Sequence, residues 1–189
     1  MVRTYKNNET KKEPITKTTF LSSLQQFYPN GVDVIVDSVS RVFENKYNDN
    51  KPSIFVNLTI TGNMDKCLGY EIDDDGNYVE ELDKLGKMTN KVIELDGTGK
   101  SVSISYNLKY SDEYDDEIDE LEFDVNSWSS FYPLLNYGLK LNGMVSQNNE
   151  DSVLVTYEDI KEALVDLEFK ATSKYVRSGK FKYNMLVPI

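Results

Sequence analysis

Ile54-Phe55-Val56-Asn57-Leu58-Thr59-Ile60-Thr61 is the stretch that decides the fold, because its even-numbered residues are all aliphatic. Its odd-numbered residues are polar apart from Phe55. Side chains of a β-strand point alternately to the two faces of a sheet, so this period of two predicts a strand with one buried face. A turn cluster at 48–52 precedes the strand, and an alternating pattern at 32–47 slips at Ser38 before that turn. We therefore predict a hairpin whose first strand is long, bulged and bent.

The rest of the chain adds short helices and strands to this hairpin. Apolar spacing predicts helices at 18–28, 127–138 and 157–168, with Gly138 ending the second and Thr156 capping the third. A strand at 91–95 is expected to form a second hairpin with 101–110 through a turn at 96–99. The remaining predicted strands are 121–125, 152–155, 169–176 and 181–187, whereas 65–90 is predicted to be an irregular acidic insertion.

This order of elements predicts a mainly β, α+β fold. A bent strand pair, a third strand, a helix and a closing hairpin follow the chain order of an OB-fold, an antiparallel β-barrel that commonly binds single strands. We expect an OB-like barrel with two to three short helices in one domain at 18–189, after a flexible segment at 1–17. Acidic insertions are expected near 63–90 and 111–120. Another α+β or β-barrel arrangement is the alternative, because the match with the OB-fold rests on the order of the elements and on no residue signature.

The closing hairpin is the most basic part of the chain. If Phe169 and Ala171 point to the core together with Phe181, Tyr183, Met185 and Val187, the intervening positions lie on the opposite face. Those positions include Lys170, Lys174, Lys182 and Asn184. We therefore expect both strands of the hairpin to present one basic surface.

Composition argues against an enzyme. The chain has no histidine and one cysteine, Cys67, which removes the commonest general base, the Ser/His and Cys/His nucleophile pairs, and zinc sites built from several thiolates. Phosphate-binding and serine-hydrolase motifs are absent from the sequence, and Asp73-Asp74-Asp75-Gly76-Asn77 does not match the spacing of a calcium loop. We expect no catalytic residues, no cofactor and no metal.

Charge is segregated along the chain, although the net charge is −11. Residues 63–124 carry 19 acidic and 6 basic side chains, whereas the last 21 residues carry five basic side chains and no acidic one. Salt screens charges more than about 10 Å apart, so a ligand responds to the local potential of the face that it contacts. A basic binding face on an acidic protein is therefore physically admissible, and solvated acidic loops are the simplest account of the acids.

Four short segments give the sequence a family resemblance. Phe123 to Ser127, Leu134 to Gly138, Phe169 to Ala171 and Gly179 to Tyr183 resemble small phage or archaeal-virus replication proteins of the single-stranded-DNA-binding type. The resemblance covers about a third of the chain, and it implies binding of single-stranded DNA or RNA in replication, repair or recombination. This chain departs from the family's usual acidic carboxy terminus, because it is acidic internally and ends in Val187-Pro188-Ile189.

Single-strand binding needs cations that contact phosphates and aromatic rings that stack on bases. Candidate platforms are Phe55, Tyr47 and Tyr175, for which ordinary packing is the alternative role. Candidate cations are Arg41, Lys46, Lys51, Lys170, Lys174, Arg177, Lys180 and Lys182, for which a solvated sheet face is the alternative.

A second hypothesis assigns the function to the acids. An acidic protein that mimics DNA would occupy a basic groove of a host protein, using 112–124 and 65–83 as the decoy surface. The residues of that alternative surface are Asp112, Glu113, Asp115, Asp116, Glu117, Asp119 and Glu120.

The expected partners are single-stranded DNA or RNA, with replication or host proteins as further partners. Met1 to Lys12 carries no signal-peptide pattern, and no apolar stretch is long enough to span a membrane. We therefore expect a cytoplasmic location without membrane contact, in the host cytoplasm if the protein is viral.

Overall fold

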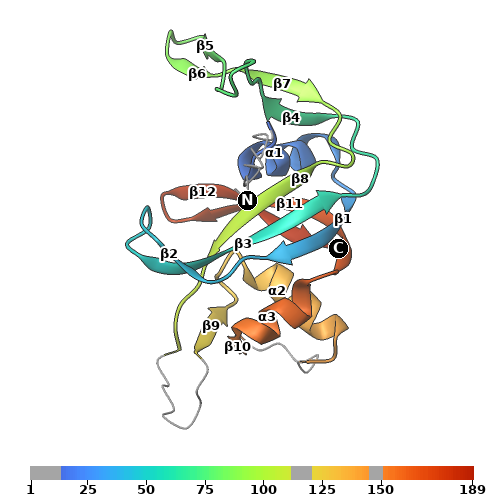
Figure 1. Cartoon of the computed structure of the whole chain (residues 1–189), viewed down its shortest axis with the longest axis vertical. Coiled ribbons are helices and arrows are strands. Elements are labelled where there is room, and N and C mark those ends of the chain that lie inside the picture. Colours follow the sequence, from blue (N-terminus) through green and yellow to red (C-terminus); the bar gives the residue numbers. More distant parts are fainter. Residues whose placement is uncertain (1–13, 112–120, 145–150) are drawn as a thin grey trace, which may run out of the picture.

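The computed structural model describes residues 14–111, 121–144 and 151–189, which form a mainly β fold with three short helices (Figure 1). The helices are α1 (Lys17–Phe27), α2 (Tyr132–Leu141) and α3 (Tyr157–Leu164). The strands are β1 (Val32–Val39), β2 (Phe43–Asn45), β3 (Lys51–Ile60), β4 (Cys67–Tyr70), β5 (Glu80–Leu82), β6 (Met88–Asn90), β7 (Val92–Leu95), β8 (Ser101–Asn107), β9 (Glu122–Asn126), β10 (Ser152–Thr156), β11 (Glu168–Ser178) and β12 (Phe181–Pro188).

The main sheet has six strands in the order β12-β11-β1-β3-β2, with β8 paired to the other edge of β3. All of these pairs are antiparallel. Among the described residues, no pairing joins β8 to β12, so the sheet is not closed into the predicted barrel. Helix α1 contacts β8, β11 and β12, and the Lys17 ammonium donates a hydrogen bond to the Ser105 carbonyl of β8 at 3.4 Å. Within the described part of the chain, contacts with this helix take the place of a barrel's closing strand pair.

The predicted bent hairpin is confirmed. β1 pairs with β3 in a register that shifts between Val36 and Ser38, and the chain then leaves the ladder before continuing as β2. β3 buries Ile54, Val56, Leu58 and Ile60, each at 0% exposure, and leaves Phe55, Asn57 and Thr59 at least partly exposed on the outer face. The period of two in the sequence therefore identifies the buried face of this sheet.

The core is one cluster between the inner face of the sheet and the helices. Figure 1 shows α1 on one side of the sheet in that view and α2 with α3 on the other. Helix α3 begins with the predicted cap: the Thr156 hydroxyl accepts from the Asp159 N–H at 3.1 Å, and the Asp159 carboxylate accepts from the Thr156 N–H at 2.8 Å. No helix of the described residues is both long enough and apolar enough to cross a membrane.

The predicted pairing of 91–95 with 101–110 is wrong, and so is the irregular insertion at 65–90. β7 pairs with β4, and β5 pairs with β6, so 65–95 forms a β-ribbon that we call the arm. The turn at 96–99 returns the chain to the main sheet, because the Gly97 N–H donates to the Met64 carbonyl and the Gly99 N–H to the Ile60 carbonyl. Figure 1 shows the arm extending beyond α1 at the top of the molecule.

The predicted helix stop at Gly138 is also wrong, because α2 continues through it to Leu141. A Cβ atom at Gly138 would lie 2.4 Å from the carbonyl oxygen of Ala163. This glycine therefore allows α2 to approach α3 closely. Helix α3 in turn ends at Leu164, four residues before its predicted end.

The closing hairpin forms as predicted, but the two faces of its second strand are exchanged relative to the prediction. Arg177 pairs with Lys182, and Ser173 pairs with Leu186, which is 2% exposed. Residues opposite one another in a sheet point to the same face, so Lys182 lies on the face that buries Ala171 and Leu186. Lys170 and Lys174 lie on the other face. The single basic surface expected for the hairpin is therefore divided between two faces.

Candidate nucleic-acid interface

The β2–β3 hairpin and the segment just before it carry five predicted residues, and all five are exposed. They are Arg41, Lys46, Tyr47, Lys51 and Phe55. The turn has a fixed form, because the Asn45 carbonyl accepts from the N–H groups of Asn48 and Asn50, both at 3.0 Å. Tyr47, in this turn, is fully exposed.

Phe55 is a supported aromatic platform on the outer face of β3. Its ring stacks on Phe43 with centroids 5.0 Å apart and planes inclined by 15°, and Phe55 is 40% exposed. One face of the ring is thus occupied by Phe43, and part of the side chain is open to solvent. Packing and ligand stacking are therefore compatible at this position.

The outer face next to Phe55 is polar and internally hydrogen-bonded. The Asn57 amide donates to the Ser38 hydroxyl at 2.9 Å, and the Asn57 oxygen accepts from the Ser103 hydroxyl at 2.5 Å. The Thr59 hydroxyl donates to the Asp37 carboxylate at 2.6 Å. These bonds link polar side chains of β1, β3 and β8 across the outer face.

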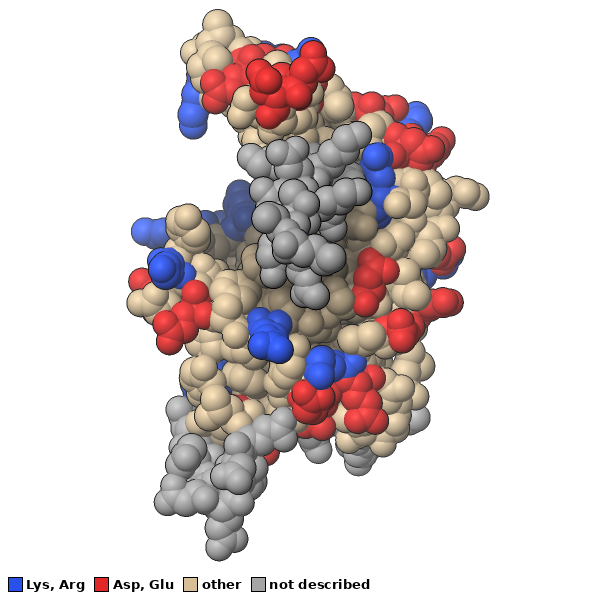
Figure 2. All heavy atoms as spheres, in the orientation of Figure 1, with Lys and Arg blue, Asp and Glu red and all other residues tan. Residues whose placement is uncertain are grey.

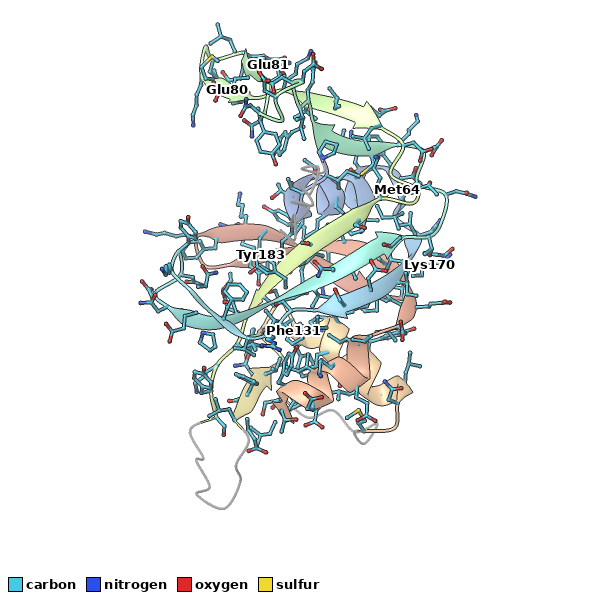
Figure 3. All side chains as sticks on the ribbon, viewed as in Figure 1. Met64, Glu80, Glu81, Phe131, Lys170 and Tyr183 are labelled. Carbon is cyan, nitrogen blue, oxygen red and sulfur yellow. The ribbon has the colours of Figure 1, made fainter. Side chains whose placement is uncertain are left out.

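The β11–β12 hairpin holds the remaining predicted residues, and the structure does not bring them all together. Lys170 lies 3.5 Å from the Asp33 carboxylate, so its charge is partly offset (Figure 3). Lys174 shares its face, whereas Arg177 and Lys180 are exposed at the turn. None of the ion pairs among the described residues involves Arg41, Lys46, Lys51, Lys174, Arg177, Lys180 or Lys182.

Tyr175 and Lys182 line a pocket of about 440 Å³ with Lys17 of α1, a cation that the sequence prediction did not include. The Lys17 ammonium lies 5.5 Å from the centre of the Tyr106 ring, and burial lowers the pKa of this lysine. Burial also raises the pKa of the Tyr106 phenol, whose side chain is 2% exposed. These groups join α1 to the sheet and the hairpin.

Both hairpin turns point to the same side of the molecule in the view of Figure 1. Figure 2 shows Lys and Arg side chains along that margin with a few acids between them, while Asp and Glu side chains gather on the arm. The distribution of charge in space thus follows its segregation along the sequence. The end of the sheet with the two turns thus carries both cations and a few acids on this face.

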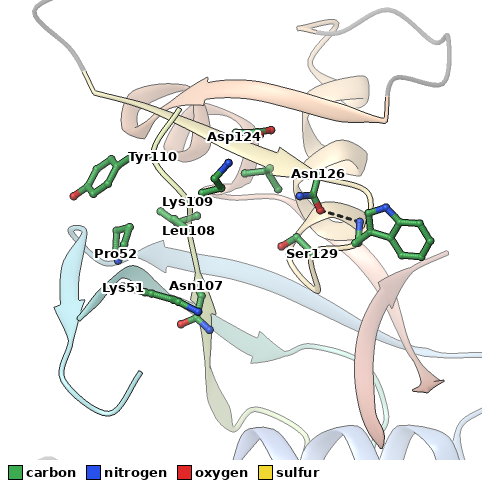
Figure 4. A pocket seen from close by; sticks show the side chains of 11 residues that line it. Lys51, Pro52, Asn107, Leu108, Lys109, Tyr110, Asp124, Asn126 and Ser129 are labelled. Carbon is green, nitrogen blue, oxygen red and sulfur yellow. Dashed lines mark hydrogen bonds between the residues drawn. The ribbon is translucent and has the colours of Figure 1, made fainter. Parts of the chain in front are cut away.

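A larger pocket of about 670 Å³ opens beside Lys51, between the end of β8 and the chain that follows β9 (Figure 4). It contains two exposed aromatic residues that were not predicted as site residues, Tyr110 and Trp128. The sequence contains one signal for this site: the single tryptophan lies between two serines, Ser127 and Ser129. The pocket is lined by Lys51, Pro52, Asn107, Leu108, Lys109, Tyr110, Asp124, Val125, Asn126, Trp128 and Ser129.

The alternative acidic surface can be placed only in part. Asp112, Glu113, Asp115, Asp116, Glu117, Asp119 and Glu120 lie outside the described residues. The second half of the decoy, 65–83, lies on the arm with Glu80 and Glu81 near its tip (Figure 3). The DNA-mimic hypothesis stays a prediction.

The aspartate-rich turn of the arm has a structural role. The Asp73 carboxylate accepts from the N–H groups of Asp75 and Asn77, at 3.1 and 2.8 Å. These bonds close the turn, as aspartate side chains commonly do. No group of three or more acidic or cysteine side chains suited to holding a metal ion occurs within 14–111, 121–144 and 151–189.

Comparisons with known proteins give no relative: no protein-family model, no curated protein and no solved structure matches this chain.

Proposed function

We propose that this protein binds single-stranded nucleic acid without catalysing a reaction, at the end of the main sheet where the β2–β3 and β11–β12 hairpins turn. The observation that carries the proposal is the β2–β3 hairpin with the residue Arg41 just before it, which presents Arg41, Lys46 and Lys51 as exposed cations together with the exposed rings of Tyr47 and Phe55. Cations beside aromatic faces are what a single strand requires, because phosphates and bases alternate along it.

The topology supports the same surface. An OB-fold binds strands on the face of its second and third strands, between the loop that joins strands one and two and the loop that joins strands four and five. In the expected order, these elements correspond to β3 and β8, the turn at 46–50 and the turn at 179–180. We therefore propose an open OB-like arrangement with its ligand on the outer face of β3 and β8.

Local charge makes such binding compatible with the net charge of −11. Cations on the two hairpins act on a phosphate that they touch, whereas acids on the distant arm are screened beyond about 10 Å at 0.1 M salt. Binding is expected to weaken as salt rises, by roughly 0.7 log units per log unit of salt for each phosphate contact on a single strand. A role in replication, repair or recombination, and a phage or viral origin, follow from the sequence resemblance alone.

The test is a fluorescence-anisotropy titration of the whole protein with labelled oligo-dT, oligo-U and a DNA duplex of the same length at low salt. We expect both single strands to bind at or below about 10 µM, and the duplex to bind more weakly because its paired bases cannot stack on exposed rings. Absence of binding to either single strand, or equal affinity for the duplex, would contradict the proposal.

A further inference from the structure

The pocket beside Lys51 has the size and the lining of a ligand site. Its volume of about 670 Å³ falls within the roughly 300 to 1,000 Å³ of small-molecule pockets. Three segments surround it: the start of β3, the chain that continues β8, and β9 with its following turn. Figure 4 shows Tyr110 on one side of the pocket, Asn126 and Ser129 on the other, and Lys51 with Asn107 along its lower edge.

Tyr110 is an aromatic surface held in place from behind. Its ring stacks on Phe123 with centroids 5.4 Å apart and planes inclined by 28°. Phe123 is 2% exposed, whereas Tyr110 is 43% exposed. The buried ring therefore fixes the orientation of the exposed one, as Phe43 does for Phe55.

Trp128 is exposed on a turn that is closed by hydrogen bonds. The backbone N–H of Trp128 donates to the Asn126 carboxamide oxygen at 3.1 Å, and the backbone N–H of Ser129 donates to the Asn126 carbonyl at 2.9 Å. The backbone N–H of Phe131 donates to the Ser129 hydroxyl at 3.2 Å. Phe131 is fully buried and anchors the turn. The Trp128 side chain is nevertheless 89% exposed, so it contributes almost nothing to the core. A hydrogen-bonded turn that presents an unpacked indole is suited to stacking.

The polar groups of the pocket are suited to the other parts of a nucleotide. The carboxamide oxygen of Asn107 accepts from the Ser53 hydroxyl at 2.9 Å, and that of Asn126 accepts from Trp128. Within the described residues, the N–H groups of these two amides are left to donate to a ligand acceptor such as a base carbonyl. Lys51 supplies a positive charge for a phosphate at the edge that adjoins the β2–β3 hairpin.

We infer that this pocket receives one unpaired nucleobase of the bound strand, stacked on Trp128 or Tyr110, with the adjoining phosphate at Lys51. This inference rests on the proposed single-strand binding and adds a specific subsite to it. A base in the pocket would extend the path of the strand from Tyr47 and Phe55 past Lys51.

The single tryptophan allows a direct test, because intrinsic indole fluorescence reports on this site alone. The whole protein is titrated with oligo-dT while anisotropy of the labelled oligonucleotide and fluorescence of Trp128 are followed in parallel. The variants are Trp128→Ala and Tyr110→Ala, with Tyr78→Ala, an exposed aromatic on the arm, as the matched control. Thermal denaturation confirms that each variant is folded.

We expect the fluorescence of Trp128 to be quenched, and this quenching to saturate at the same oligo-dT concentration as the anisotropy. Loss of the ring that stacks on the base, Trp128 or Tyr110, should weaken binding by about 5- to 150-fold, the equivalent of one base stack, while Tyr78→Ala binds as wild type. Normal anisotropy without a fluorescence change, together with unaltered binding by Trp128→Ala and Tyr110→Ala, would overturn the pocket assignment and leave single-strand binding intact. No anisotropy change with wild-type protein would overturn the proposed function and this subsite with it.

Discussion

Gly138→Ala tests the close packing of α2 against α3. The added Cβ would lie 2.4 Å from the Ala163 carbonyl oxygen and 3.1 Å from a methyl group of Leu164. A C···O contact normally falls at about 3.3 to 3.6 Å, so the helices would have to separate by roughly 1 Å. The obstructing atom belongs to the backbone, and no change of rotamer can relieve the clash.

The expected magnitude follows from two opposing terms. Overpacking of this kind costs up to about 3 kcal/mol, whereas replacing glycine by alanine inside a helix gains about 1 kcal/mol. We therefore expect a net destabilisation of about 2 kcal/mol. For a chain of 189 residues, this corresponds to a fall in Tm of about 4 to 8 °C.

Thermal denaturation followed by circular dichroism measures this effect. Asn136→Ala in the same helix is the matched control, because it changes helix propensity at a half-buried position without approaching α3 in the same way. We expect its Tm to stay within a few degrees of wild type. A Gly138→Ala protein as stable as wild type would refute the inference that this glycine is required by the helix contact.

Two further predictions concern α1 and α3. Burial lowers the pKa of the Lys17 ammonium in the folded protein below its ordinary 10.5. At a pH between the folded and the unfolded pKa, the unfolded chain binds more protons than the folded protein, so the free energy of unfolding rises with pH. Urea denaturation at several pH values should show that the Lys17→Met variant has lost this rise. If the free energy of unfolding of the variant depends on pH as that of the wild type does, the result would count against burial of the ammonium. Thr156→Ala should cost about 1 kcal/mol in the same assay because it removes the cap of α3, whereas Thr89→Ala on the arm should cost less than 0.5 kcal/mol. Equal stabilities of these two variants would contradict a stabilising cap.

Local patterns predicted the elements whose formation depends on their own residues. The alternation through Ile54 to Thr61 identified β3 and its buried face, and the slip at Ser38 marked the register shift between β1 and β3. Thr156 followed by two acids marked the start of α3. In each case the signal lies within one segment of the chain.

Features that depend on contacts between distant segments could not be predicted in this way. Met185, Leu186 and Val187 are three consecutive apolar residues, so the sequence does not determine which of them faces the core, and the incorrect choice exchanged the faces of β12. Gly138 resembles a helix stop until Ala163 is placed beside it.

The candidate site was predicted only where its residues share one hairpin. Lys46 and Lys51 flank a single turn and Arg41 lies just before β2, whereas Lys170 is separated from Lys182 by the register of β11 and β12. Trp128 and Tyr110 line a pocket formed by segments that pair only in the folded protein, so no local pattern groups them with Lys51.

The salt dependence of oligo-dT binding tests most directly whether the basic hairpins contact phosphates. Arg177→Glu with Lys180→Glu reverses two charges at the β11–β12 turn, and Lys84→Glu with Lys87→Glu makes the same change in net charge on the arm. Each phosphate contact on a single strand contributes roughly 0.7 to the slope of log K against log salt, so we predict that the first pair of substitutions makes this slope shallower by about 1.4. The second pair should leave the slope unchanged. Equal slopes for the two variants would contradict binding through these hairpins.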